Sequence, residues 1–178
     1  IIAEGIQDLA LVGRVLKVGF AAKRIGKLRD LPKDFEPWVK VIFPSIVEGD
    51  EGNADIATPL VPVPLFWRRG ESIVVLRNAG GIDNIGAKLH ADLRRIERLS
   101  AWHCAGVAAV VDSDGKPPEE RFRTIETSLR NEKLRNEQLP VPGALGTVIE
   151  GAPRVGVFAL PEPGKAGTLE DVLLPLAG

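Results

Sequence analysis

The chain has 178 residues, of which 44% are hydrophobic and 26% charged, a composition typical of globular proteins and unlike that of disordered or fibrous ones. Its 23 basic and 24 acidic residues give a net charge of −1, which excludes an overall attraction to nucleic acid or membrane surfaces but permits a local basic patch. No apolar run is long enough to span a bilayer, so we expect no membrane contact and a cytoplasmic protein.

Two residue types exclude several kinds of chemistry. Cys104 is the single cysteine, so the chain has no internal disulfide framework and no zinc site built from several cysteines. Tyrosine is absent, so the chain by itself contains no phenol nucleophile.

The first part of the chain predicts a strand, a helix and then an irregular region. Residues 1–3 form a short apolar run, and residues 6–16 carry apolar side chains at helical spacing. Residues 19–70 are rich in proline, glycine and charge and show no sustained period, which is typical of a loop-rich insertion. Apolar residues such as Phe20 and Phe43 indicate that this insertion packs against the domain.

The second part alternates between strand and helix patterns. We expect strands at 72–77, 106–111 and 154–160, and helices at 82–99, 119–134 and from 167 onward. The strands are apolar throughout, which is typical of strands covered on both faces. The sequence therefore predicts a single α/β domain over 1–178, with a mostly parallel sheet, helices on both faces and the insertion at 19–70.

Acidic residues follow several of these strands. Glu4 ends the first strand, Asp8 comes one helical turn later, and Asp112 and Asp114 end the strand at 106–111. In open parallel sheets, ligands bind beyond the carboxyl ends of the strands. Converging carboxylates without cysteine or histidine partners favour Mg²⁺ or Mn²⁺. Each acid also has an ordinary structural interpretation, in a turn or at a helix end, and only their joint placement favours a metal site.

The order of these motifs resembles the Toprim domain of topoisomerases, bacterial primases, recombination-mediator proteins and OLD-type (overcoming-lysogenization-defect) nucleases. The resemblance rests on a strand followed by Glu4-Gly5 and Asp8, a strand leading to Asn78-Ala79-Gly80-Gly81, and a strand ending in Asp112-Ser113-Asp114. The tail, from Pro153 through Gly167-Thr168-Leu169-Glu170-Asp171, is similar to small stand-alone Toprim-like proteins of unknown function. The resemblance covers residues 1–18 and 71–178.

The resemblance implies a Mg²⁺ site made by Glu4, Asp112 and Asp114. It implies that the same three residues are catalytic. In OLD-type nucleases a second acid and a glutamate nearer the C-terminus complete a two-metal arrangement, and Asp8 and Glu170 occupy comparable places here. Asp171 is an alternative to Glu170 for the glutamate near the C-terminus. Those nucleases also use a lysine near the site, for which Lys165 and Lys116 are the candidates here. Their ATPase portion has no counterpart, because the chain lacks a phosphate-binding loop motif.

Other noticeable residues favour structural roles. We expect His90 at the surface or boundary of its helix, and we disfavour a nucleophile pair of His103 and Cys104 because sequence neighbours at a strand start point to opposite sides. Gly80-Gly81 fits either a phosphate cradle or a tight turn. We expect the tryptophans to pack in the interior. We expect solvent-exposed positions for the basic residues of 82–99 and for Arg68, Arg69, Arg121, Arg123 and Arg130.

These observations support three hypotheses. The first is a Mg²⁺-dependent Toprim-like protein that acts on nucleic acid by phosphodiester hydrolysis. The second is a non-catalytic metal- or nucleic-acid-binding module that works with a partner protein in a DNA- or RNA-processing or defence complex. The third is a scaffold whose acids only cap turns.

Overall fold

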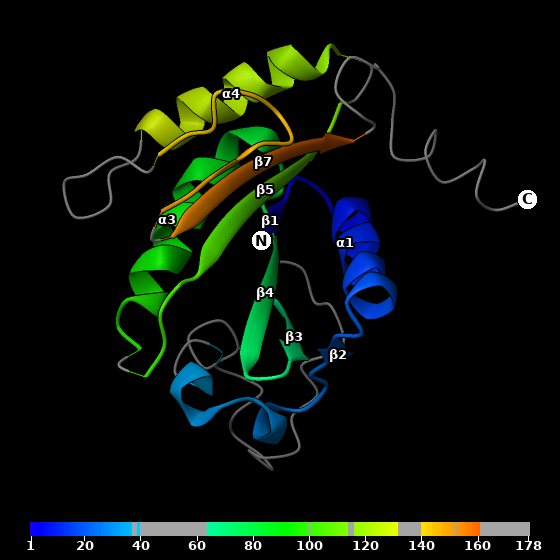
Figure 1. The fold of residues 1–178 in the computed structure, drawn as a ribbon, viewed down its shortest axis with the longest axis vertical. Helices are drawn as coiled ribbons and strands as arrows, with labels where there is room; N and C mark the ends of the chain where they lie inside the picture. Colours follow the sequence, from blue (N-terminus) through cyan, green and yellow to red (C-terminus); the bar gives the residue numbers. More distant parts are fainter. Residues whose placement is uncertain are drawn as a thin grey trace, which may run out of the picture.

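The computed structural model describes residues 1–36, 39, 64–99, 101–113, 116–131, 140–151 and 153–160 (Figure 1). The α-helices whose bounds lie within these residues are α1 (Ile6–Gly19), α3 (Ile85–Ile96) and α4 (Pro118–Asn131). Seven strands form one sheet in the order β2-β3-β4-β1-β5-β7-β6. Their bounds are β1 Ile2–Ala3, β2 Lys23–Arg24, β3 Leu65–Arg69, β4 Ser72–Asn78, β5 Gly106–Asp112, β6 Val148–Ile149 and β7 Arg154–Leu160.

The sheet is mixed, so the prediction of a mostly parallel sheet is wrong. Strands β4, β1, β5 and β7 are parallel neighbours, whereas β2 and β3 at one edge and β6 at the other pair antiparallel. The prediction followed the continuous apolar runs, which belong to the central strands. The antiparallel edges were missed because β2 and β6 have two residues each and β3 ends in Arg68-Arg69. The α/β class itself is confirmed.

Helices cover both faces of the sheet, as expected. Successive residues of β5 point to opposite sides: Ala109 and Val111 pack with α3 and α4, whereas Val110 packs with Leu9 and Leu16 of α1. Figure 1 shows α1 alone on one side and α3 with α4 on the other. The central strands are therefore apolar on both faces because both faces are buried.

The described part of the expected insertion at 19–70 belongs to the sheet and to the core. It contributes β2 and β3 to one edge. Short 3₁₀ turns at Leu28–Asp30 and Lys33–Phe35 carry a third apolar cluster beneath β3 and β4. Phe35 packs edge-on against Phe66 and Trp102, at ring centroid distances of 6.1 and 5.1 Å. The described part of this segment packs through Ile25, Leu28, Leu31 and Phe35. Phe20, which was expected to pack, is 47% exposed instead, and Phe43 lies outside the described residues.

Helices α3 and α4 are in close contact. A Cβ atom added at Gly86 would lie 2.4 Å from the backbone oxygen of Ser128, so only glycine fits at this crossing. The Gly86 N–H also donates to Ser128 Oγ over 3.1 Å. With the sheet on one side and α4 on the other, α3 has a wide buried face. His90 is 1% exposed within it, so its expected surface or boundary position is wrong.

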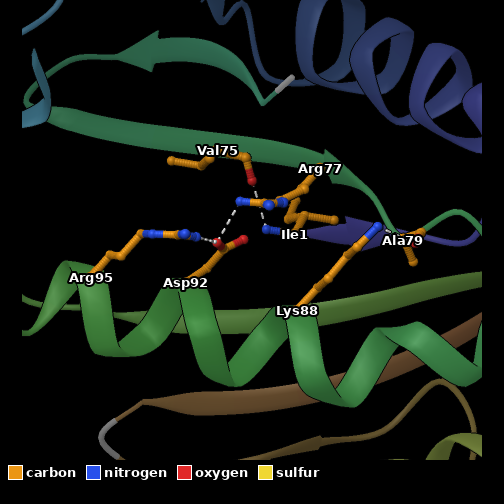
Figure 2. A network of polar contacts seen from close by, with 7 residues as sticks. All are labelled: Ile1, Val75, Arg77, Ala79, Lys88, Asp92 and Arg95. Carbon is orange, nitrogen blue, oxygen red and sulfur yellow. Dashed lines mark hydrogen bonds and ion pairs between the residues drawn. The ribbon is translucent and has the colours of Figure 1, made fainter. Parts of the chain in front are cut away.

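A charged network joins α3 to the sheet (Figure 2). Asp92 on α3 accepts hydrogen bonds from Arg77 of β4 over 2.6 Å and from Arg95 over 3.0 Å. Lys88, one turn earlier, donates to the backbone oxygen of Ala79 over 2.5 Å. Because Arg77 and Asp92 are largely buried, their pairing fixes α3 against the strand that precedes the Gly80-Gly81 turn.

A large cavity of about 700 Å³ lies at the amino-terminal edge of the central strands. It is lined mainly by apolar residues of β4, β5 and α3 and by Trp102, His103 and Cys104. Among the described residues, no helix is long and apolar enough to cross a membrane. The helix expected from 167 onward lies outside the described residues.

Candidate functional site

Glu4 lies at the carboxyl end of β1, where backbone hydrogen bonds hold it from both sides. Its N–H donates to the oxygen of Val110 in β5 over 3.0 Å. Its own backbone oxygen accepts from the N–H groups of Gly80 and Gly81, each over 3.1 Å. Both glycines have positive φ, at 69° and 118°, which a glycine adopts without strain. The two glycines thus form a tight turn whose N–H groups position Glu4.

Asp8 lies in the first turn of α1 and points back toward Glu4. Its Oδ2 accepts a hydrogen bond from the Gly5 N–H over 2.8 Å, which closes the start of the helix. The side chain is 3% exposed. Burial raises the pKa of Asp8 to about 6, with smaller contributions in the same direction from the charges of Asp112 and Glu4. The Gly5 hydrogen bond and the charge of Arg121 oppose that rise in pKa.

Three of the predicted acids meet around one cavity. The cavity measures about 210 Å³ and lies at the carboxyl ends of β1 and β5. It is lined by Glu4, Gly5, Ile6, Gln7, Asp8, Asp112 and Arg121. The remaining predicted site residues, Asp114, Glu170, Asp171 and Lys165, lie outside the described residues.

Arg121 of α4, like His90, does not lie where the sequence predicts it. It is 8% exposed, not part of a solvated helix face. Its Nη2 donates to Glu4 Oε2 over 2.5 Å, and its Nε donates to the backbone oxygen of Asp112 over 2.8 Å. The sequence does contain an indication of this burial, because Arg121 lies on the same face of the helix as the buried Phe122, Ile125 and Leu129. A basic residue on an apolar helix face indicates a buried acidic partner.

The cavity carries oxygen donors of the kind that hard divalent cations prefer. Mg²⁺ is commonly held by one or two carboxylates together with water, and carboxylate oxygens are the donors present here. Burial is the main cause of the raised pKa of Asp8, and the charges of Asp112 and Glu4 add to it, so a cation at the cavity would lower this pKa. The charge of Arg121 already acts in this direction. Within the described ranges, no three His, Cys, Asp or Glu side chains are arranged to hold a metal.

The remaining candidates lie away from this cavity. Lys116 donates to Glu120 over 3.1 Å in an exposed ion pair and does not line the cavity. Cys104 and His103 line the large cavity at the opposite edge of the sheet. Burial raises the pKa of the Cys104 thiol, which disfavours a reactive thiolate. Trp67, at 7% exposed, packs as expected.

Comparisons with known proteins give one family. A family model described as "Protein of unknown function (DUF3226)" matches residues 1–178. Neither a curated protein nor a solved structure matches the chain.

Proposed function

Because the chain belongs to the DUF3226 family, whose function is unknown, we propose a function from its own residues: a Toprim-like protein that uses Mg²⁺ or Mn²⁺ for phosphodiester hydrolysis on nucleic acid. One observation carries the proposal. Glu4 and Asp8, four residues apart, and the distant Asp112 line the same cavity at the carboxyl ends of two neighbouring parallel strands.

The placement of the acids supports a cation site with an open side. Asp8 is almost completely buried, whereas Glu4 and Asp112 are partly exposed and can reach a ligand from solvent. Glu4 and Asp112 would bind the cation, with Asp114 as the further ligand that the sequence pattern predicts, and Asp8 and Glu170 would support them. A bound Mg²⁺ would supply charge neutralisation at the phosphoryl oxygens.

Arg121 would compete with the cation for Glu4 in this function. It holds Glu4 and the end of β5 together through its two hydrogen bonds. With Arg121 in place, the three described carboxylates retain a net charge of about −2, which one divalent cation balances. Asp114 and Glu170, which lie outside the described residues, would add the negative charge that a second cation of the OLD-type arrangement balances.

The same contact favours a second candidate function, a non-catalytic binding module. Arginine is permanently charged and forms short, strong hydrogen bonds with carboxylates. Because the pair with Arg121 engages Glu4, a cation would be held at the cavity mainly by Asp112, which favours metal binding without hydrolysis.

Thermal unfolding with and without Mg²⁺ or Mn²⁺ tests the proposal. We expect the metal to raise Tm, by the linkage between binding and folding, and Asp112→Asn to abolish the rise. Asp83→Asn is the matched control, because Asp83 is an exposed acid that lines a different groove, between α3 and α4. It should keep the full metal effect.

Cleavage of labelled DNA and RNA separates the two candidate functions. The nuclease hypothesis predicts Mn²⁺-dependent cleavage that is lost in Glu4→Gln and Asp112→Asn but kept in Asp83→Asn. A metal-dependent rise in Tm without cleavage supports the binding module. An unchanged Tm at millimolar metal contradicts a cation site altogether.

A further inference from the structure

A second surface feature lies at the other end of α1 from the acidic cavity. Its residues are Arg14, Lys17, Phe20, Arg24 and Arg69, here called the α1 C-terminal patch. Figure 1 shows α1 running from the end of β1 to β2. The 14 residues of α1 span about 20 Å, so the patch is distinct from the acidic cavity.

The patch is basic although the whole chain is near neutral. Arg14 and Lys17 on α1 and Arg24 on β2 are exposed here, whereas the basic residues at 27, 29 and 33 belong to the segment that packs against Phe66 on the other face of the sheet. Arg69 reaches the same region from β3. The local charge therefore suits a polyanion, which the net charge of −1 conceals.

Strand pairing places two arginines on the side of the sheet that α1 covers. Trp67 faces α1, because a Cβ atom at Gly13 would lie 3.1 Å from its ring. Arg24 is directly opposite Trp67 in the antiparallel pair, and Arg69 is two residues beyond Trp67. Both arginines therefore lie on this face, next to the end of α1.

An aromatic ring is exposed within these charges. Phe20 follows the last residue of α1 and is 47% exposed. The guanidinium of Arg69 lies over its ring, 5.4 Å from the centroid. Lys17 is one turn earlier on α1. An exposed phenyl ring in contact with one guanidinium, with further basic residues on α1 and β2, provides a stacking surface for a base and contacts for the phosphates.

The backbone that presents Phe20 is strained. Ala21 has φ of 51°, the single positive φ at a non-glycine residue in the part of the chain that the structure describes. Ala22 is buried and its N–H donates to the oxygen of Leu16 over 2.9 Å, which holds the turn. A left-handed residue commonly follows the end of a helix, but it is rarely alanine, so this turn is held at some cost in strain.

We propose that the α1 C-terminal patch binds single-stranded nucleic acid, with Phe20 stacking on an unpaired base and Lys17, Arg24 and Arg69 contacting phosphates. Unpaired bases expose the faces that a stacking residue needs, whereas paired bases stack on each other. Positive charge on β2 also suits an edge strand, where it prevents pairing with other chains. That role requires neither the exposed ring of Phe20 nor the strained turn.

The test measures binding of a labelled oligothymidylate by fluorescence anisotropy, in EDTA and at several salt concentrations. EDTA makes the result independent of the acidic cavity, so a failure of the proposed metal-dependent function leaves this test intact. Arg69→Gln and Lys17→Gln should each weaken binding about fivefold and lower the salt slope by about 0.7. Arg98→Gln, an exposed arginine beyond α3, is the matched control and should change binding less than about twofold.

Variants of Phe20 test the stacking contact. Phe20→Leu should weaken binding about fivefold or more without changing the salt slope. Phe20→Trp should bind as tightly as the wild type or more tightly, because a larger ring stacks on a base at least as well. Urea unfolding of each variant checks that the fold is kept. Unchanged affinity in Phe20→Leu and Arg69→Gln would overturn the proposal. Equal or tighter binding to duplex DNA or anionic vesicles, with no effect of Phe20, would overturn it as well.

Discussion

Arg121 and Glu4 are 117 positions apart in the sequence and form a hydrogen-bonded ion pair of 2.5 Å. Arg121 is on α4 and Glu4 follows β1, so the pair joins a helix to the carboxyl edge of the central strands. The Arg121 side chain is 9% exposed and that of Glu4 is 20% exposed, so water screens the pair only partly.

Replacing Arg121 should separate its structural role from its effect on metal binding. In Arg121→Gln we expect a loss of about 2 kcal/mol in the free energy of unfolding, because a charged hydrogen bond is lost in a largely buried place. We also expect Mg²⁺ to bind about fivefold more tightly, since Glu4 no longer has a competing partner. Urea unfolding and calorimetric titration measure the two effects.

Arg130→Gln is the control on the same helix. Arg130 pairs with Glu126 at the surface, so its replacement should cost less than about 1 kcal/mol. Weaker Mg²⁺ binding in Arg121→Gln would contradict competition and indicate that Arg121 orients Glu4 for the cation.

The pKa of Asp8 gives a pH dependence of stability. The folded protein holds the proton of Asp8 up to about pH 6, whereas the unfolded chain releases it near the ordinary value of 3.8. The stability due to this proton is therefore complete below about pH 4 and is lost as pH rises to about pH 6, a change of about 3 kcal/mol. Unfolding in EDTA across this pH range measures the loss.

Asp8→Asn should remove this contribution. The amide oxygen can still accept the Gly5 N–H, so the variant should be more stable than the wild type near neutral pH and should bind metal more weakly. A carboxyl titration of Asp8 by NMR provides an independent check. A midpoint near pH 4 would contradict the effect of burial.

The buried network of Figure 2 predicts a large cost for losing one carboxylate. Asp92→Asn leaves Arg77 largely buried without its charged partner, so we expect a loss of about 3 kcal/mol or more. Glu120→Gln breaks the exposed pair with Lys116 and should cost less than about 1 kcal/mol. Similar losses in the two variants would show that the network contributes no more than a surface pair.

The crossing of α3 and α4 predicts the effect of a single methyl group. Gly86→Ala places a Cβ atom against the backbone of Ser128, which cannot rotate away, so we expect a loss of about 2 kcal/mol or more. Gly19→Ala is the matched control, because it also lies in a helix but its nearest neighbour would be 4.0 Å away. It should be neutral or stabilising by up to about 1 kcal/mol.

The sequence predicted the elements whose patterns are continuous. The strand at 154–160 was placed correctly at both ends, and β4 and β5 to within one residue, because buried central strands are unbroken apolar runs. The two-residue strands β2 and β6 are too short to show a period, and their pairing depends on contacts with distant residues.

The candidate site was predicted in part for a similar reason. The positions of Glu4, Asp8 and Asp112 followed from the rule that ligands gather at the carboxyl ends of parallel strands. Arg121 was not predicted, because its contact with Glu4 depends on how α4 packs across the sheet. A charged residue on an apolar helix stripe gave the local signal. His90 was misplaced because the second contact of α3, with α4, was not foreseen.

Strand β1 has a mechanical consequence for the acidic cavity. Strands β4 and β5 are not paired with each other and are joined in the sheet through the two residues of β1. The short strand β1 thus connects the half of the sheet that contains β4 to the half that contains β5. The backbone of Glu4 is hydrogen-bonded to both halves, to Val110 on one side and to Gly80 and Gly81 on the other. If one half of the sheet slides relative to the other, these hydrogen bonds must break or Glu4 must move with one of the halves. The carboxylate of Glu4 therefore responds to the alignment of the whole sheet.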